Sequence, residues 1–231
     1  KAEWATFAWT AILAVSYLAV MAAGPVIGAY ADAHAAKKKV LVLVTAGCVI
    51  STALLWQAGP GTIIWAAVFV IISNFCYAIG ENIAAAFLPE LARAESLGKV
   101  SGWGWSWGYV GGLVALGLCL AWIMTAASRG QSTSEAVPAT NLITAVIYLL
   151  GACVTFAMLR ERAVPVPKQK IEFHAFARLA HTAREAARYR DLLRLFLCGT
   201  CYQAGVATVI TLAAIYAQVV MGFTTQDTLE L

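Results

Sequence analysis

Glu81 is the only acidic or basic residue inside a long apolar run of this sequence. An ionisable side chain in apolar surroundings is by default a candidate for a functional role. On a helix that begins at Thr62, a rise of about 1.5 Å per residue places Glu81 about 28 Å along the axis, close to the far edge of a ~30 Å apolar layer. Two interpretations stay open: a carboxylate that reaches interfacial water or a nearby cation, and a carboxylate that takes part in gating or coupling.

Two series of polar residues recur at helical spacing. Asn74 and Tyr77 precede Glu81 at steps of three and four residues, so the three side chains share one helix face. Gln203 lies on a similar face with Thr200. Polar groups that face lipid lack hydrogen-bond partners, so both faces are expected to point toward other helices. Hydrogen bonds between helices and contact with a bound solute are both compatible with that position.

Gly104, Gly108 and Gly112 recur at every fourth residue. A face of small residues at this spacing lets a second helix approach closely. We therefore predict helix packing at these three glycines.

The sequence shows no arrangement of catalytic or metal-binding residues. Cys198 and Cys201 have the spacing of a redox motif, but no pattern of a soluble redox domain surrounds them, so we expect structural thiols. The three histidines, His34, His174 and His181, are isolated from one another. Nucleophile motifs, phosphate-binding loops and pairs of acids are missing from the sequence. We expect the protein not to be an enzyme and to hold no cofactor or metal.

The composition identifies the surroundings of these residues. Of the 231 residues, 61% are hydrophobic and 12% are charged, and the mean hydropathy is +0.76. Soluble domains average roughly 45–50% apolar and about 25% charged residues. These figures exclude a soluble globule and a disordered chain, and they predict an integral membrane protein. Its apolar stretches are long and do not alternate with polar residues, which predicts an all-α membrane protein and not a β-barrel.

Five charge-free stretches each exceed the roughly 20 residues that cross a membrane as a helix. The stretch between Lys39 and Glu81 has room for two crossings, with a turn at Gly59–Gly61 near its middle. Six transmembrane helices are predicted, near residues 4–30, 40–57, 62–87, 101–125, 141–159 and 192–221.

The basic residues predict how the helices are oriented. Fourteen of the sixteen lysines and arginines fall in the loops on one side of these spans, and only Lys1 and Arg129 fall on the other. The positive-inside rule assigns the crowded side to the cytoplasm, so both ends of this chain are expected outside. The positive net charge therefore reflects topology, and no nucleic-acid partner is expected.

Residues 160–191 form a polar cytoplasmic stretch between the fifth and sixth spans. Within it Phe173, Phe176 and Leu179 recur at helical spacing, with Arg178 and Arg184 on the opposite side. A basic amphipathic helix at the membrane surface and a solvated linker with a charged face are both open.

Several short motifs resemble those of the major facilitator superfamily. Gly28–Asp32 followed by Lys37–Lys39 is similar to the cytoplasmic loop signature of that superfamily. Further motifs resemble the subgroup that includes the fungal vacuolar amino-acid effluxers, the "unknown major facilitator" family. These motifs are Gly24–Gly28, Phe87–Glu90, Val100–Gly104, Gly108–Gly112 and Ala214–Ala217.

The resemblance implies a twelve-helix fold of two six-helix lobes, in which the six predicted spans correspond to helices two to seven. Residues 1–159 would hold five helices of the N-terminal lobe, residues 160–191 the cytoplasmic interlobe loop, and residues 192–231 the first helix of the C-terminal lobe. The first family helix and the rest of the second lobe are expected outside this chain.

The resemblance also implies a secondary transporter that moves a small polar solute, with an amino acid as the candidate, by alternating access. The third and sixth spans would correspond to cavity-lining family helices, which makes Asn74, Tyr77 and Gln203 candidates for the substrate cavity. Asp32 and Glu81 would be candidates for gating or coupling, with a proton as the candidate ion. The implied partners are a lipid bilayer and a small-molecule solute, at the inner membrane of a bacterium or the vacuolar membrane of a fungus.

Some positions depart from the pattern of the subgroup. Ala84 and Ala85 stand before Phe87 where the subgroup often has Tyr and Asn, and Ala204 stands where it often has an acid. In the loop signature, Ala35 replaces the usual Gly. A non-transporting membrane scaffold with a degenerate cavity is therefore the alternative function.

Overall fold

The structure, a computed structural model, describes residues 2–59, 61–162, 180–181, 184–185 and 188–222. Its elements are all helical, with no strand among these residues, which confirms the predicted all-α class. The chain divides into two compact units, Lys1–Glu172 (unit 1) and Phe173–Leu231 (unit 2), and each is described by itself. The predicted assignment of residue ranges to two lobes and an interlobe loop stays a prediction.

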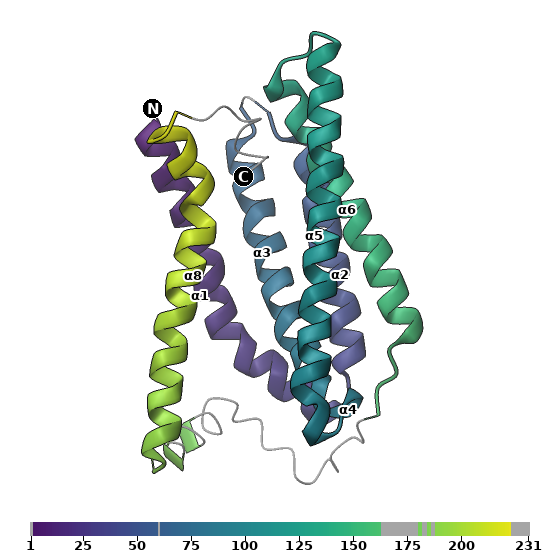
Figure 1. The fold of residues 1–231 in the computed structure, drawn as a ribbon, viewed down its shortest axis with the longest axis vertical. Coiled ribbons are helices and arrows are strands. Elements are labelled where there is room, and N and C mark those ends of the chain that lie inside the picture. Colours follow the sequence, from purple (N-terminus) through teal and green to yellow (C-terminus); the bar gives the residue numbers. More distant parts are fainter. Residues whose placement is uncertain (1, 60, 163–179, 182–183, 186–187, 223–231) are drawn as a thin grey trace. The chain divides into compact units, whose positions relative to one another are not determined.

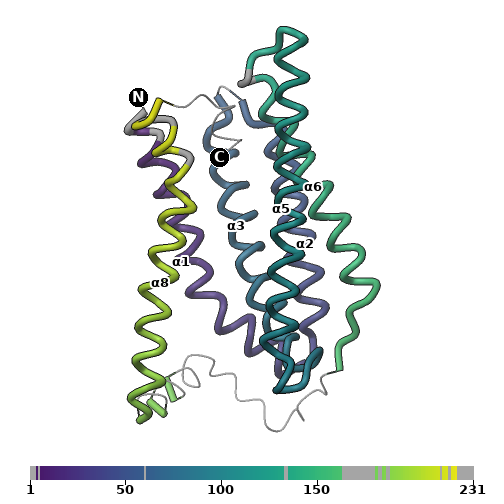
Figure 2. The backbone as a smooth tube through the Cα atoms, viewed as in Figure 1, coloured from purple at the N-terminus to yellow at the C-terminus, as the bar shows by residue number. Residues whose placement is uncertain are grey.

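Six long helices, joined by short helical turns and loops, make up most of the described chain (Figures 1 and 2). In chain order the elements are α1 (Ala2–His34), α2 (Lys37–Leu54), η1 (Leu55–Gln57), α3 (Ile63–Ala85), α4 (Leu88–Leu91), η2 (Ala94–Ser96), α5 (Leu97–Ser128), α6 (Thr133–Met158) and α8 (Arg190–Val219). The six long helices have the length and apolar composition of membrane-crossing helices, as the sequence predicted. Phe173, Phe176 and Leu179 of the predicted amphipathic helix lie outside the described residues.

Helix α6 begins eight residues before the predicted start at 141, because its first turn carries its own cap. The Ser132 backbone N–H and hydroxyl both donate to Glu135 Oε2, each at 2.9 Å. Together with the bond from the backbone of Glu135 to Ser132, these contacts form a capping box. A capping box satisfies N–H groups that a helix start otherwise leaves unpaired. Charge-free length alone therefore underestimated this helix.

The turn between α1 and α2 is closed by an alanine in the left-handed region. Ala35 has φ +47°, and the backbone N–H groups of Ala35 and Ala36 donate to the carbonyls of Asp32 and Ala31 at 3.5 and 2.9 Å. This pair of bonds is the Schellman arrangement, in which the left-handed position favours glycine. The usual glycine of the loop signature corresponds to this position, and the alanine here adopts the left-handed backbone that favours glycine.

In unit 1 the tightest helix packing joins α2 to α3. The core cluster consists of Ala31, Leu41, Val44, Ile79, Ile83 and Phe87, which come from α1, α2, α3 and the turn between α3 and α4. A Cβ placed on Gly47 would lie 2.8 Å from Cys76 Sγ, and one on Gly80 would lie 3.4 Å from a methyl of Val44. These two glycines allow the close approach of α2 and α3.

Helix α5 carries the three glycines that the sequence predicted to pack, and their surroundings differ from those of Gly47 and Gly80. A Cβ on Gly104, Gly108 or Gly112 would meet no atom within 4 Å in the described structure. Helix α5 contacts α6 further along, through Cys119, and Trp122 Nε1 donates to the Ala136 carbonyl at 3.2 Å. Packing at the three α5 glycines stays a prediction.

The helices of unit 1 alternate in direction, as successive membrane crossings do. The α1–α2 turn, α4 and the end of α6 lie at one end of the unit, and the α2–α3 and α5–α6 connections lie at the other (Figure 1). Lys37–Lys39 therefore share an end of unit 1 with Glu90 and with residues 159–162, which follow α6.

Candidate functional site

Unit 1 contains an open cavity of about 410 Å³ between α1, α2, α3 and α6. Aromatic and aliphatic side chains form most of its wall, together with a few hydroxyl, thiol and amide groups. Its lining residues are Trp9, Leu13, Cys48, Thr52, Leu55, Val70, Ser73, Asn74, Tyr77, Thr144, Ala145 and Tyr148. None of these lining side chains is charged, so the wall offers apolar contact and neutral hydrogen-bonding groups.

Asn74 lines this cavity and also ties α3 to α1. Its Nδ2 donates to Ser16 Oγ at 2.6 Å, and the Ser16 hydroxyl donates to the Leu13 carbonyl at 2.8 Å. Ser16 is fully buried, and a buried hydroxyl without a partner is costly. The amide of Asn74 thus makes one of the interhelical hydrogen bonds that the sequence left open, and it does so at the cavity wall.

A second polar contact at the cavity joins α2 to α3. The Thr52 and Ser73 hydroxyls lie 2.8 Å apart, and Cys48 Sγ lies 3.6 Å from Ser73 Oγ. Tyr77 lines the same cavity and is half exposed. Asn74 and Tyr77, which share a face in the sequence, therefore reach one cavity, although a role in solute binding stays a prediction for both.

Within unit 1, the candidates Glu81 and Asp32 do not line this cavity. Glu81 is exposed on α3, and no hydrogen bond or ion pair to it occurs among the described residues. Gln203 is exposed on α8 of unit 2. Its expected position opposite Asn74 and the gating role of Glu81 both stay predictions.

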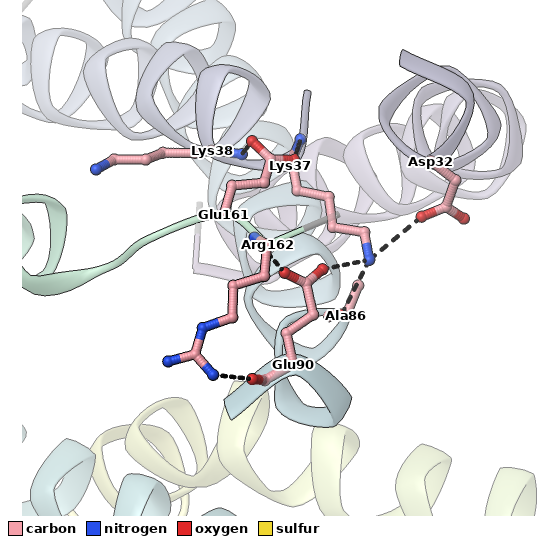
Figure 3. A network of polar contacts seen from close by, with 7 residues as sticks. All are labelled: Asp32, Lys37, Lys38, Ala86, Glu90, Glu161 and Arg162. Carbon is pink, nitrogen blue, oxygen red and sulfur yellow. Dashed lines mark hydrogen bonds and ion pairs between the residues drawn. The ribbon is translucent and has the colours of Figure 1, made fainter. Parts of the chain in front are cut away.

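At the lysine-bearing end of unit 1, Lys37 is the centre of an ionic network (Figure 3). Its Nζ lies 3.1 Å from Glu90 Oε1 and 3.5 Å from Asp32 Oδ1, and it donates to the Ala86 carbonyl at 3.3 Å. The Lys37 and Glu90 side chains are 14% and 15% exposed, whereas Asp32 is 60% exposed. The pair with Glu90 is therefore the better shielded from water, and the pair with Asp32 is screened.

At this end of unit 1, Glu161 caps the start of α2 and Lys38 caps the end of α6. Glu161, which follows α6, accepts hydrogen bonds from the backbone N–H groups of Lys37 and Lys38 at 2.6 and 3.2 Å. In return Lys38 Nζ donates to the carbonyls of Phe156 and Leu159 at 2.8 and 2.6 Å. A carboxylate at a helix start and an ammonium at a helix end both complement the helix dipole. The start of α2 and the end of α6 are thus held together.

Arg162 completes the network. Its backbone N–H donates to Glu90 Oε2 at 3.0 Å, and its Nη1 lies 3.5 Å from the Glu90 carbonyl (Figure 3). Glu90 therefore links Lys37 of α2 with the chain that leaves α6. We call Asp32, Lys37, Lys38, Glu90, Glu161 and Arg162 the charged network.

Of the charged network, the sequence analysis singled out only Asp32 as a site residue. Glu90 was noted as part of a motif, and the contribution of Glu161 and Arg162 was missed. A usable signal existed: Glu90 and Glu161 are acids that directly follow the third and fifth spans on the lysine-rich side. Acids at that position face several basic residues, so ion pairs there are favoured.

The fold and the two sites define a class: a multi-pass α-helical membrane protein with a cavity between its helices and an ionic network at one end. A sequence model of the family described as "Vacuole effluxer Atg22 like" matches residues 5–231. The chain belongs to this family, which confirms the resemblance to the major facilitator superfamily read from its motifs, and the description of the family is that of effluxer-like proteins and not of enzymes.

One curated relative carries the same class in its name. The chain is 26% identical over 206 residues to the uncharacterized MFS-type transporter YxiO of Bacillus subtilis strain 168. The match covers 88% of this chain and 48% of the relative, so the chain spans about half the length of that protein. No solved structure gives a significant match.

Proposed function

We propose that this chain supplies five helices of the N-terminal lobe and the first helix of the C-terminal lobe of a secondary transporter, which moves a small polar solute across a membrane by alternating access. An amino acid is the candidate solute, a proton is the candidate coupling ion, and a bacterial plasma membrane is the favoured location because the matched relative is bacterial. Residues 160–191 would join the two lobes, and the solute would bind near mid-membrane between them.

The observation that carries this proposal is the cavity between α1, α2, α3 and α6, found in a chain that belongs to an effluxer-like family. Its wall combines apolar side chains with hydroxyl and amide groups from several helices. A polar solute that leaves water needs such groups, because an unpaired polar group in apolar surroundings is costly. Asn74 and Tyr77 would offer these groups from unit 1, and Gln203 would offer them from unit 2.

The charged network would act as the inner tie of this transporter. Alternating access requires contacts at one end that hold in one state and release in the other. The ion pair of Asp32 with Lys37 is the weakest of the charged network because Asp32 is exposed to water. We assign this pair the gating role. Glu81 would act nearby, where a change of its charge alters contacts between the lobes.

The test uses the full-length protein and a panel of radiolabelled amino acids, with binding measured in detergent and transport in proteoliposomes. Asn74→Ala and Gln203→Ala should each weaken solute binding about three- to tenfold, the effect of one lost hydrogen bond. Glu81→Gln should leave binding largely intact and change the pH dependence of transport. Asn82→Ala, at an exposed position of the same helix, is the matched control and should change neither.

Ser16→Ala separates a binding role of Asn74 from a purely structural one. It removes the hydrogen-bond partner of Asn74 but keeps the Asn74 amide at the cavity. If Ser16→Ala weakens binding as much as Asn74→Ala, the amide acts through helix packing. If no solute of the panel is bound or moved by the intact protein, the alternative of a non-transporting scaffold gains support.

A further inference from the structure

The outward face of α2 differs from the face that packs on its neighbours. Leu41, Val44 and Cys48 are buried in unit 1. On the opposite side Val42 and Leu43 are exposed, and Leu43 keeps 73% of its surface open. In a membrane-crossing helix such an apolar face is covered either by acyl chains or by another helix.

This outward face carries a groove of about 540 Å³, lined by Lys38, Lys39, Val42, Leu43 and Ala46. Lys39, Val42, Leu43 and Ala46 follow one another at helical steps, so they form a continuous stripe along the helix. The lysines lie at its start, and Ala46 lies about 10 Å further into the membrane by helix rise. The groove thus has a cationic head and an apolar body.

The two lysines of the groove differ in the hydrogen bonds of their ammonium groups. Lys38 Nζ is held by the carbonyls of Phe156 and Leu159, so its aliphatic stem forms part of the wall. Lys39 is exposed, and no acceptor for its ammonium occurs among the described residues.

The nearby acids do not neutralise Lys39. Glu161 is engaged by the start of α2. Glu90 and Asp32 face Lys37. An ammonium at the head of an apolar groove is complementary to a phosphate that carries acyl chains.

We propose that this groove binds an anionic glycerophospholipid of the cytoplasmic leaflet. Its phosphodiester accepts hydrogen bonds from Lys39, and one acyl chain lies along Val42, Leu43 and Ala46. The site is separate from the proposed solute cavity, and its occupancy does not depend on whether the protein transports.

Native mass spectrometry of the full-length protein in detergent tests the site, with titrations of phosphatidylglycerol and of phosphatidylcholine with the same acyl chains. The first phosphatidylglycerol should bind about fivefold more tightly than phosphatidylcholine, the effect of one lysine near an anionic headgroup. Lys39→Gln should abolish that preference, and Lys39→Arg should keep it. Ala46→Phe should fill the groove and weaken the first binding event for both lipids.

Lys99→Gln is the matched control, since Lys99 lies near the start of α5, outside the groove, with its Nζ 6.0 Å from the Trp103 ring. Equal losses in Lys99→Gln and Lys39→Gln would show diffuse attraction to a basic surface and overturn the proposal. Competition by glycerol phosphate at equal concentration would overturn the role of the acyl chain. A dimer of the protein that Ala46→Phe dissolves would show that a second copy, and not a lipid, covers the groove.

Discussion

At the residue scale, the difference between Glu90 and Asp32 shows how burial sets the value of an ion pair. Both carboxylates contact Lys37 Nζ, at 3.1 and 3.5 Å. Glu90 also accepts from the Arg162 backbone, and its side chain is 15% exposed. Asp32 is 60% exposed, so water and salt screen its charge. The two acids should therefore respond differently to loss of charge.

Glu90→Gln should lower the free energy of unfolding in detergent by about 1–2 kcal/mol, because it removes a charge-assisted hydrogen bond from a shielded ammonium. Asp32→Asn should change it by less than about 0.5 kcal/mol. Thermal or denaturant unfolding of the purified protein measures both. Equal effects would mean that the network is open to water throughout, contrary to its geometry.

Ala35 offers a second prediction at this scale. An alanine at φ +47° carries strain that glycine avoids, and the gain exceeds the entropy that a glycine adds to the unfolded chain. Ala35→Gly should therefore stabilise the protein by about 0.5 kcal/mol. Ala29→Gly, further from the end of α1, is the control and should destabilise by roughly 1 kcal/mol, since it places glycine inside a helix. A loss of stability in Ala35→Gly would refute the left-handed turn.

At the element scale, α2 is the helix of unit 1 that contacts both α3 and α6. It packs against α3 along Gly47 and Gly80, and its first turn exchanges caps with the end of α6. A sequence pattern predicts that such a helix exists, but the identity of its neighbours depends on residues far along the chain.

Gly47→Ala should test the α2–α3 contact, because the added Cβ would lie 2.8 Å from Cys76 Sγ. We expect a loss of about 1–3 kcal/mol, the usual effect of overpacking. Cys76→Ala in the same protein should restore most of that loss by removing the sulfur. Gly117→Ala, where a Cβ meets nothing within 4 Å, is the control. If Cys76→Ala gives no rescue, the two helices are not in contact at this point.

At the scale of the whole molecule, most of the charged residues of the loops of unit 1 gather at one of its two ends. The end with Lys37–Lys39 also holds Glu90, Glu161 and Arg162 (Figure 3), and the other end holds the α2–α3 and α5–α6 connections (Figure 1). The positive-inside rule assigns the lysine-rich end to the cytoplasm.

A cysteine introduced at Gln131, in the α5–α6 connection, should react with an impermeant thiol reagent added to intact cells. One introduced at Glu95, in η2 at the other end of α5, should react only after the membrane is opened. The protein without either substitution controls for its six native cysteines. Reversed labelling would invert every assignment of side, including the leaflet proposed for the anionic lipid.

The sequence by itself determined the number of helices and their all-α class, because long charge-free stretches and clustered lysines act locally and need no knowledge of neighbours. It also identified the family through short motifs. The positions of the helix ends were harder to predict from the sequence. The capping box at Ser132 and Glu135, for example, extends α6 beyond the charge-free stretch. The sequence pointed to glycine packing on α5, which stays a prediction, and it did not indicate the close contacts that the structure has at Gly47 and Gly80.

Only the tertiary structure decided which charged groups meet. Lys37 and Glu90 are 53 residues apart, and Glu161 lies 124 residues from the backbone N–H that it caps. It also placed Asn74 against Ser16, 58 residues away, at the wall of a cavity. Such partners are chosen by the packing of apolar helix faces, which sets the distances first, and the charged and polar groups then pair because leaving them unpaired is costly.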